Sequence, residues 1–461
     1  MGNISTKGVP TELGTEKISK LLMLYAIPAI IAQTASSLYH MIDSIFIGQG
    51  VGALAISGLA TTFPFMNLSA AFGAMIGVGG ATLISVKLGQ RDYDSACTIL
   101  GNLVTLNVIV GVLFGGISLL FLEDILFFFG ASEATLPYAR DFMEIVLYGN
   151  VVTHLYLGIN AALRASGHPK ESMYATIITV ICNLILAPLF IYVFDWGIKG
   201  AAFATMLSQV VTLLWQIKLL SNPNELMHLR KGIYALRSRF VKGILGIGLS
   251  PFLINAAACI VVIIINKGLR TYGDNGDMAI ASYGIANRVI FIFIMVVLGV
   301  TQGMQPIIGY NFGARRYDRV KETLKQTIIW ALAVTFTGFA LCEGIPELIA
   351  RAFTTDTTLI ANAAKGMRIS CMFIMLAGVQ MVATNFFQSI GKVNKAIFLS
   401  LTRQVIFLIP LLLILPQYMG ENGVWCSIPI ADFISGILAI VLLRGQFKSW
   451  SHPTFMANSH Q

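Results

Sequence analysis

Apolar runs long enough to cross a bilayer recur along almost the whole of this 461-residue chain. A helix needs about 20 consecutive, mostly apolar residues to span a hydrocarbon core about 30 Å thick. Only 11% of the residues are charged, whereas soluble proteins contain roughly 25%. The sequence therefore predicts an all-α integral membrane protein.

Twelve such runs are predicted, in two sets of six. The first set covers 21–46, 53–82, 98–122, 142–163, 173–194 and 200–220, and the second covers 244–266, 279–308, 326–342, 368–390, 396–415 and 423–443. The expected organisation is an N-terminal segment over 1–20, a lobe over 21–220, a linker over 221–243, a lobe over 244–443 and a tail over 444–461. Basic residues alternate with Leu, Tyr and Phe in the linker, which favours an amphipathic helix lying on anionic membrane lipid.

The positions of the basic residues predict the orientation. Of the 31 Lys and Arg residues, 22 lie in the termini, the linker and the loops on their side, and seven lie in the opposite loops. Retained positive charge marks the cytoplasmic side. We therefore expect a multi-pass protein of the bacterial inner (plasma) membrane with both termini cytoplasmic. The net charge of +9 is spread over short loops, so no nucleic-acid partner is expected.

The two sets of helices are related in sequence. Residues 89–94 read Gly-Gln-Arg-Asp-Tyr-Asp and residues 313–318 read Gly-Ala-Arg-Arg-Tyr-Asp, and Pro28 has a counterpart in Pro251. The offset between the copies is 223 or 224 residues throughout. Because six helices separate the copies, this repeat predicts two six-helix lobes related by a pseudo-twofold axis along the membrane normal, with a central cleft.

One carboxylate lies clearly within a predicted helix of the first lobe. Asp43 shares a helix face with Tyr39 and His40. A charged side chain within the bilayer costs about 2.5–3.5 kcal/mol on insertion scales, so Asp43 is a candidate for binding a proton or another cation. The alternative is a capping carboxylate near the interface. Pro28, an interior proline, predicts a bend in the same helix, either static or linked to Asp43.

Other polar side chains within the spans have two interpretations. Asn160, Asn183 and Thr205 are able to supply oxygens around Asp43, or they form interhelical hydrogen bonds that involve no ligand. Arg403 and Asp432 lie in the second lobe and are predicted to form a structural ion pair, since an unpaired charge there would be costly.

Methionine and aromatic side chains of the second lobe suggest an adaptable cavity for small-molecule substrates. The alternative is that they face lipid or core. The candidate lining residues are His40, Phe291, Met295, Met304, Met375 and Gln380. The chain has no recognisable catalytic motif, so no enzyme activity, cofactor or catalytic residue is expected. No obligatory protein partner and no metal are expected either, apart from a possible sodium ion at Asp43.

Several motifs together resemble the multidrug and toxic compound extrusion (MATE) family, particularly its DinF/MepA-type branch. The motifs are Pro28 with Asp43, Asn160 before the sequence Arg164-Ala-Ser-Gly167, Asn183 before Pro188, residues 197–205, Gln305-Pro306 and residues 309–314. The resemblance covers nearly the whole chain. It implies a V-shaped pair of lobes that exports drug-like, often cationic molecules in exchange for protons or sodium by alternating access. It also implies a cation site formed by Asp43, Asn160, Asn183, Thr205 and Tyr39.

One departure from the family pattern bears on the coupling ion. Several relatives carry a second acid four residues after the asparagine of the fifth span, where this chain has Ala187. A sodium site usually takes several oxygen ligands, so the loss of a carboxylate favours a proton and leaves sodium as the alternative. The competing function is a flippase for lipids or lipid-linked oligosaccharides, which would need a more basic cleft than Arg288 and Arg403 provide.

Overall fold

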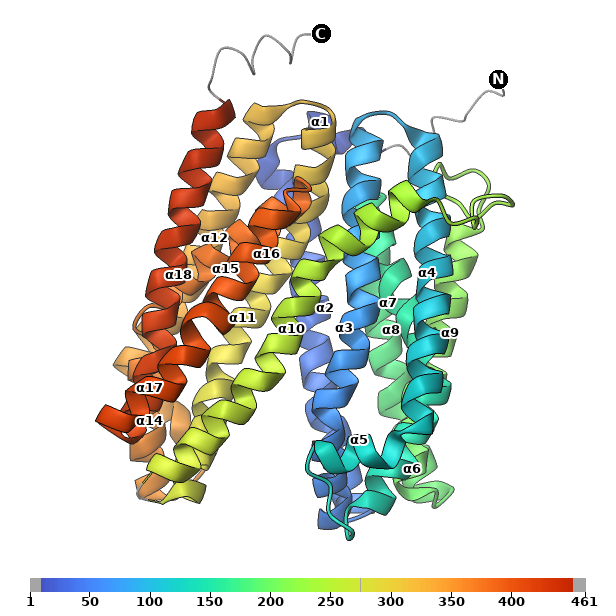
Figure 1. Ribbon diagram of the computed structural model, residues 1–461. Coiled ribbons are helices and arrows are strands. Elements are labelled where there is room, and N and C mark those ends of the chain that lie inside the picture. The colour runs from blue at the N-terminus through green and yellow to red at the C-terminus, as the bar shows by residue number, and fades with distance from the viewer. Residues whose placement is uncertain (1–9, 274, 451–461) are drawn as a thin grey trace. The chain divides into compact units, whose positions relative to one another are not determined.

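The computed structural model describes residues 10–273 and 275–450, except for the side chains of His40, Met41 and Ala53. Across this part of the chain every regular element is helical (Figure 1). Ten helices are long and apolar enough to cross a membrane, and two bent pairs raise the number to twelve if each pair is one span. The predicted all-α membrane fold is thus confirmed.

The chain divides into two compact units. Unit 1 contains Ile31–Phe252 together with the short helix α1 (Glu12–Thr15), and unit 2 contains Glu16–Ile30 and the residues from Leu253 onward. The helices wholly within unit 1 are α3 (Ala53–Gly89), α4 (Tyr93–Leu120), α5 (Leu122–Phe128), α6 (Leu136–Tyr148), α7 (Asn150–Ala165), α8 (Pro169–Pro188), the π-helix η1 (Leu189–Val193) and α9 (Gly197–Leu220). Those of unit 2 are α11 (Gly276–Gly313), α12 (Tyr317–Gly344), α13 (Pro346–Arg351), α14 (Thr357–Cys371), α15 (Ile374–Ser389), α16 (Val393–Leu401), the π-helix η2 (Thr402–Leu408), α17 (Ile409–Met419) and α18 (Glu421–Trp450).

Two long helices, α2 (Ile18–Gly50) and α10 (Ser238–Tyr272), belong to both units. The first part of α2 packs closely on α11, because a Cβ on Gly303 would lie 2.5 Å from the Cα of Ala26. The first part of α10 packs as closely on α3, because a Cβ on Gly79 would lie 2.0 Å from the carbonyl oxygen of Ile244. The division between units therefore falls within these two helices, whereas the sequence suggested a division at the linker.

The repeated sequence motif has the same backbone conformation in both units. Arg91, between α3 and α4, has φ 60°, and Arg315, between α11 and α12, has φ 59°. Both residues thus adopt the left-handed conformation that L-residues seldom take. In unit 1, the Lys87 ammonium donates to Asp92 at 2.8 Å and lowers the pKa of that carboxyl. The sequence repeat is therefore matched by a structural one at this turn.

The fourth and tenth predicted spans are each formed by two helices. Helices α6 and α7 meet at 58°, and α14 and α15 meet at 51°. Gly149 lies between α6 and α7, and a Cβ there would come within 2.1 Å of the sulfur of Met206. The absence of a side chain at the bend thus lets α9 approach closely.

The prediction of an amphipathic helix over 221–243 is wrong for most of that segment, since no helix lies between Leu220 and Ser238. Instead, side chains of α4 bind the linker backbone. Asn102 Nδ2 donates to the carbonyl oxygens of Ile233 at 3.3 Å and Ala235 at 3.0 Å, and Asn102 Oδ1 accepts from the Arg237 N–H at 2.8 Å. These carbonyl groups accept hydrogen bonds from the side chain of Asn102 on α4 and not from the N–H groups of a following helical turn. This bonding explains why the backbone of the segment is irregular.

Candidate functional site

The candidate cation-binding carboxylate lies in the part of α2 that belongs to unit 1. Asp43 follows Tyr39 by four residues within one helix, so the two side chains lie on the same face. Asp43 is buried, with 7% of its surface exposed. Its Oδ1 atom has no hydrogen-bond partner among the described residues. A buried carboxylate oxygen without a donor is costly, so this atom is suited to a proton, a cation or a water molecule.

Three of the predicted site residues are joined by hydrogen bonds beside Asp43. The Tyr39 hydroxyl lies 3.1 Å from Thr205 Oγ1, which lies on α9. Asn183 of α8 donates from Nδ2 to Thr205 Oγ1 at 3.0 Å and to the Tyr39 hydroxyl at 3.4 Å. The amide group thus directs both hydrogens of its Nδ2 into this cluster.

Asn183 contributes a second oxygen without a donor. Its Oδ1 atom has no hydrogen-bond partner among the described residues, and the residue is 1% exposed. The Thr205 hydroxyl can donate to the carbonyl oxygen of Ala201, which lies 3.1 Å away. In that arrangement Tyr39 is the donor to Thr205. The hydrogen bonds among Tyr39, Asn183 and Thr205 then leave acceptor atoms free on Asp43 and Asn183 among the described residues. A proton or a metal cation binds to such acceptor atoms.

Asn160 belongs to a neighbouring network between α7 and α8. Its Nδ2 donates to Thr176 Oγ1 at 3.2 Å, and its Oδ1 accepts from Ser172 Oγ at 2.5 Å. The structure places it in this network, with no bond to Tyr39, Asn183 or Thr205 among those described. A carbonyl oxygen has two lone pairs, so Asn160 could still bind a cation, and its coupling role stays a prediction.

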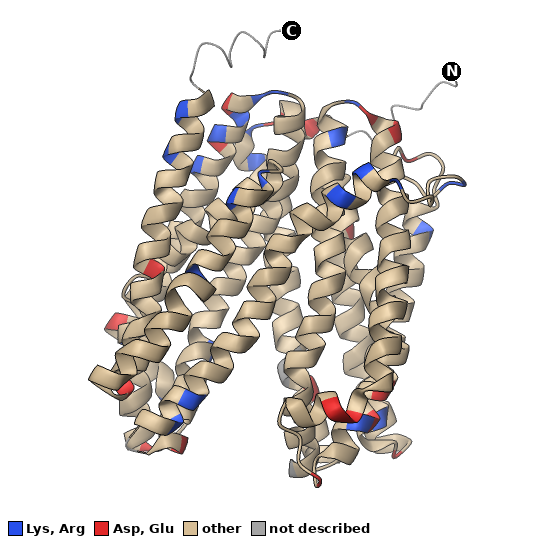
Figure 2. Ribbon diagram, in the orientation of Figure 1, with Lys and Arg blue, Asp and Glu red and all other residues tan. Residues whose placement is uncertain are grey.

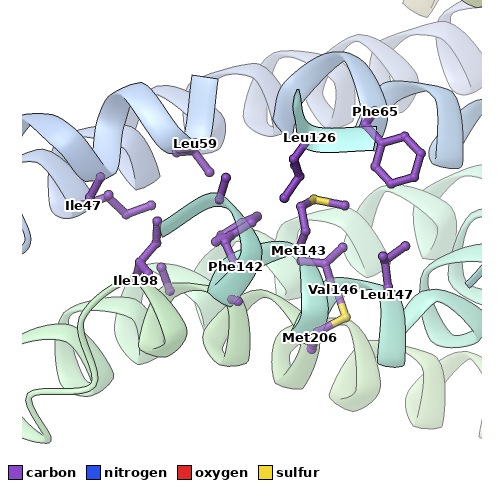
Figure 3. Close-up of a cluster of buried hydrophobic side chains, with 14 of the residues drawn as sticks. Ile47, Leu59, Phe65, Leu126, Phe142, Met143, Val146, Leu147, Ile198 and Met206 are labelled. Carbon is purple, nitrogen blue, oxygen red and sulfur yellow. The ribbon is translucent and has the colours of Figure 1, made fainter. Parts of the chain in front are cut away.

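An apolar cluster closes one end of the site. Ile47 lies one helical turn after Asp43, Ala187 one turn after Asn183, and Ala201 one turn before Thr205. All three residues are fully buried in this cluster. Figure 3 shows other members of the cluster, with Ile47 and Ile198 facing Leu59 and Phe142. The methyl group of Ala187 therefore occupies a packed position one turn after Asn183.

Pro28 lies within α2 but in the part that belongs to unit 2. It is 15 residues before Asp43, which corresponds to about 22 Å along a helix. The helix passes from unit 2 to unit 1 between Ile30 and Ile31. Because proline has no N–H to complete the preceding turn, the helix is weakened close to this passage, and its bending role stays a prediction.

The predicted ion pair of unit 2 is present in the structure. Arg403 Nε lies 2.5 Å from Asp432 Oδ1, and the side chains are 19% and 4% exposed. Arg403 lies in η2, and Asp432 lies in α18. The pair is separate from Asp43, which belongs to unit 1. Its purely structural role stays a prediction.

The candidate cavity residues lie in differing environments. Phe291 is 45% exposed, and Met304 is fully buried. Gln380 is buried and donates to the carbonyl oxygen of Leu399 at 2.9 Å. Met295 and Met375 are half-buried, and the side chain of His40 lies outside the described residues. The substrate cavity stays a prediction.

Sequence reasoning missed two sets of buried polar residues in unit 1. His154 of α7 is fully buried, and its Nε2 lies 3.0 Å from the carbonyl oxygen of Ser69 on α3. A histidine within a span is itself a signal of a polar contact. The second set is a row of hydroxyl groups on α8 that ends at Asn183. Its spacing of three or four residues would have placed these hydroxyls on one helix face.

Comparisons with known proteins agree with this architecture. The model of a protein family described as MatE matches residues 28–189 and 247–414. The chain is 28% identical over 430 residues to the multidrug export protein MepA of Staphylococcus haemolyticus, with 92% of this chain and 93% of that protein covered. It is 25% identical over 426 residues to the protein of the same name from Staphylococcus aureus, with the same coverage.

Two solved structures have the same fold as this chain. One, described as MATE in the bent conformation, has a TM-score of 0.91 at 24% identity and covers 99% of this chain and 100% of that one. The other, described as the outward-facing conformation of a multidrug resistance MATE family transporter, has a TM-score of 0.90 at 24% identity and covers 97% and 99%.

Proposed function

Because this chain belongs to the MatE family, we propose that it exports drug-like, often cationic organic molecules in exchange for protons. The two Staphylococcus relatives are named multidrug export proteins, which supports the class of cargo. The transport would occur by alternating access, with Asp43 as the residue that couples proton binding to the state of unit 1. Sodium is the alternative coupling ion.

The observation that carries this proposal is the buried Oδ1 atom of Asp43, which lacks a hydrogen-bond donor among the described residues. Ionised, this oxygen would need water or a donor from a neighbouring side chain. Protonated, the carboxyl group would pack in the same place with a smaller desolvation cost. The two protonation states thus favour different arrangements of the surrounding helices.

The size of this effect depends on how differently the two arrangements bind a proton. A ligand shifts a conformational equilibrium only by its difference in affinity for the two states. Each tenfold difference in proton affinity corresponds to about 1.4 kcal/mol. A difference of a hundredfold or a thousandfold would therefore reverse a preference smaller than about 3 or 4 kcal/mol, respectively.

The environment of Asp43 supports a proton over sodium. Sodium takes several oxygen ligands, and the position where relatives place a second acid is filled by the fully buried methyl group of Ala187. A proton needs only the one carboxylate.

The proposed membrane orientation places both termini in the cytoplasm. Figure 2 shows that, in each unit, Lys and Arg gather mainly at one end of the helices, which is the end where α4 begins in unit 1 and where α18 ends in unit 2. Such an asymmetry is typical of the cytoplasmic side. The N-terminal end of α8 and the linker would then lie on that side as well.

The proposed function is tested with purified protein in vesicles, ethidium as the fluorescent cargo, and proton and sodium gradients imposed separately. We expect a proton gradient to drive ethidium movement by the wild type and not by Asp43→Asn. Asp92→Asn is the matched control, because Asp92 lies in a turn between helices and outside the site. Ethidium movement by Asp43→Asn at the wild-type rate under a proton gradient would refute the coupling role, and movement driven only by sodium would refute the choice of ion.

A further inference from the structure

The linker between α9 and α10 runs along α4 and reaches the apolar part of that helix. Arg230 Nη2 donates to Asp94 Oδ1 at 2.9 Å, in the first turn of α4. Thr105 Oγ1, eleven residues further along α4, lies 2.9 Å from the carbonyl oxygen of Tyr234. Eleven residues of helix correspond to about 16 Å. We call the apolar residues 232–236 the linker tip, and the tip thus lies beside the span of α4 and not beyond its end.

The linker tip exposes apolar side chains next to an exposed apolar face of α4. Tyr234 and Leu236 are both exposed. On α4, Val108 and Ile109 follow Thr105 by three and four residues, so they lie on the same helix face, and both are exposed as well. The tip therefore extends a surface that suits hydrocarbon and not water.

Basic side chains without an acidic partner lie on both sides of the tip. Lys231 precedes the tip, and Arg237 and Arg239 follow it; all three are exposed, and we call them the flanking cations. None of them forms an ion pair among the described residues. The one acid of the linker, Glu225, lies 3.8 Å from His168 Nε2. The protein therefore leaves the positive charge beside the tip uncompensated.

The backbone contacts to α4 fix the depth of the tip and leave the flanking cations free. A Cβ on Gly101 would lie 2.2 Å from the carbonyl oxygen of Ile233, so the tip backbone packs directly on α4. Asn102 Oδ1 accepts the Arg237 N–H at 2.8 Å, a bond in which the guanidinium takes no part. Asn102 lies three residues nearer to the start of α4 than Thr105. The chain at Arg237 is therefore shallower along α4 than the tip.

Apolar side chains at depth with cations at a shallower level match the two layers of a phospholipid leaflet. The acyl chains are apolar, and the phosphate groups above them are negatively charged in anionic lipids. Exposed apolar groups and Lys or Arg residues together are typical of segments that bind such a surface.

We propose that the linker tip inserts among the acyl chains and that Lys231, Arg237 and Arg239 bind the phosphate groups of anionic phospholipids. In the proposed orientation these lipids belong to the cytoplasmic leaflet. A re-entrant turn fixed to α4 thus binds the membrane in place of the amphipathic helix expected from the sequence. The site depends neither on the exported molecule nor on the coupling ion.

The depth of the tip is tested in lipid nanodiscs, which leave both faces of the bilayer open to the solution. A fluorophore on a cysteine at the exposed residue Ala235 reports the tip. The same label on a cysteine at Ser221 is the matched control, because Ser221 is also exposed but lies at the C-terminal end of α9. Wild-type protein treated in the same way gives the background from the native cysteines.

We expect a nitroxide on the lipid acyl chains to quench the Ala235 label more strongly than the Ser221 label. Iodide in the aqueous phase should quench the Ser221 label more strongly. Equal quenching of the two labels by iodide would place the tip in water, where a soluble partner could cover it, and would overturn the proposal.

The choice of headgroup is tested by removing cations while keeping the contacts to α4. Arg237→Gln combined with Arg239→Gln removes two flanking cations and keeps the bond from the backbone N–H of residue 237. Arg444→Gln combined with Lys448→Gln is the matched control, since both are exposed cations near the end of α18. Native mass spectrometry of the full chain in a neutral detergent would count bound phosphatidylglycerol and phosphatidylcholine as each lipid is titrated.

We expect the wild type to bind phosphatidylglycerol more tightly than phosphatidylcholine. The linker double variant should lose affinity for phosphatidylglycerol on the order of tenfold or more, because each cation near an anionic headgroup adds to binding. Its melting temperature and its binding of phosphatidylcholine should match the wild type, and the α18 double variant should match the wild type throughout.

Three results would overturn the lipid site. The first is an equal loss of phosphatidylglycerol affinity in both double variants, and the second is equal affinity of the wild type for the two lipids. The third is displacement of phosphatidylglycerol by inorganic phosphate at a comparable concentration, which would assign the flanking cations to a soluble anion. None of these results would bear on the coupling role of Asp43, which is tested separately by transport.

Discussion

Replacing Asn102 by alanine should release the linker from α4. Asn102 is fully buried and accepts the Arg237 N–H at Oδ1. The two hydrogens of its Nδ2 are shared between the linker carbonyl oxygens of Ala235 and Ile233 and the Thr98 carbonyl oxygen of its own helix, which lies 2.9 Å away. A hydrogen bond contributes about 1 kcal/mol net to stability, and a buried polar group left without a partner costs about 1–3 kcal/mol. The loss of the bonds to the linker should therefore favour opening of the linker by about 2–3 kcal/mol.

A change of about 3 kcal/mol corresponds to a roughly hundredfold rise in the open population, since each 1.4 kcal/mol is a factor of ten. Limited trypsin digestion would measure it, because the linker carries cleavable residues at Arg230, Lys231 and Arg237. Cleavage of Asn102→Ala should be up to a hundredfold faster than cleavage of the wild type, provided that opening is rapid relative to cleavage.

Asn107→Ala is the matched control for this experiment. Asn107 lies in the same helix and is equally buried, but its Nδ2 donates to Leu103 of α4 itself. Its removal should leave linker cleavage at the wild-type rate. Equal cleavage of the Asn102 and Asn107 variants would show that the Asn102 side chain does not hold the linker, and its bonds would then not explain the irregular backbone of that segment.

Two further predictions concern stability and orientation. Asp432→Asn should lower the stability in detergent by about 3–5 kcal/mol, because Arg403 would remain as a buried charge without its partner. The double variant Arg403→Met with Asp432→Leu should recover most of the lost stability. A double variant as unstable as Asp432→Asn would contradict a purely structural role of the ion pair. A reporter cysteine at the exposed residue Ser132 should be labelled from outside the cell, and one at the exposed residue Ser221 from inside. The background labelling should be low, because the six native cysteines are buried or half-buried. Labelling of the Ser221 cysteine from outside would reverse the proposed orientation.

The sequence predicted features that depend on local composition. Apolar runs predicted the membrane helices, because span length is set by the thickness of the bilayer. The repeated motif predicted two similar halves, and the left-handed turns at Arg91 and Arg315 are alike in both. Asn183, Thr205 and Tyr39 were expected together, and the structure joins them by hydrogen bonds.

Several features that depend on packing between distant segments were not predicted. A hydropathy pattern detects span length but not the bend at Gly149, where the approach of Met206 leaves no room for a side chain. The linker has the alternation of an amphipathic helix, yet Asn102 of α4 binds its carbonyl groups. Likewise Asn160 has the residue type of a cation ligand, whereas its hydrogen bonds are to Ser172 and Thr176.

The sharing of α2 and α10 between the units has a consequence for assembly. Unit 2 includes Glu16–Ile30 from the first helix of the chain, and unit 1 includes the first part of α10 up to Phe252. A fragment that ends in the linker would therefore lack a segment on which α3 packs, and the complementary fragment would lack the segment that packs on α11. Each half of the gene thus encodes an incomplete folding unit. If the repeat arose by duplication of a six-helix ancestor, that ancestor would have completed its own core by exchanging the first part of its first helix with a second copy.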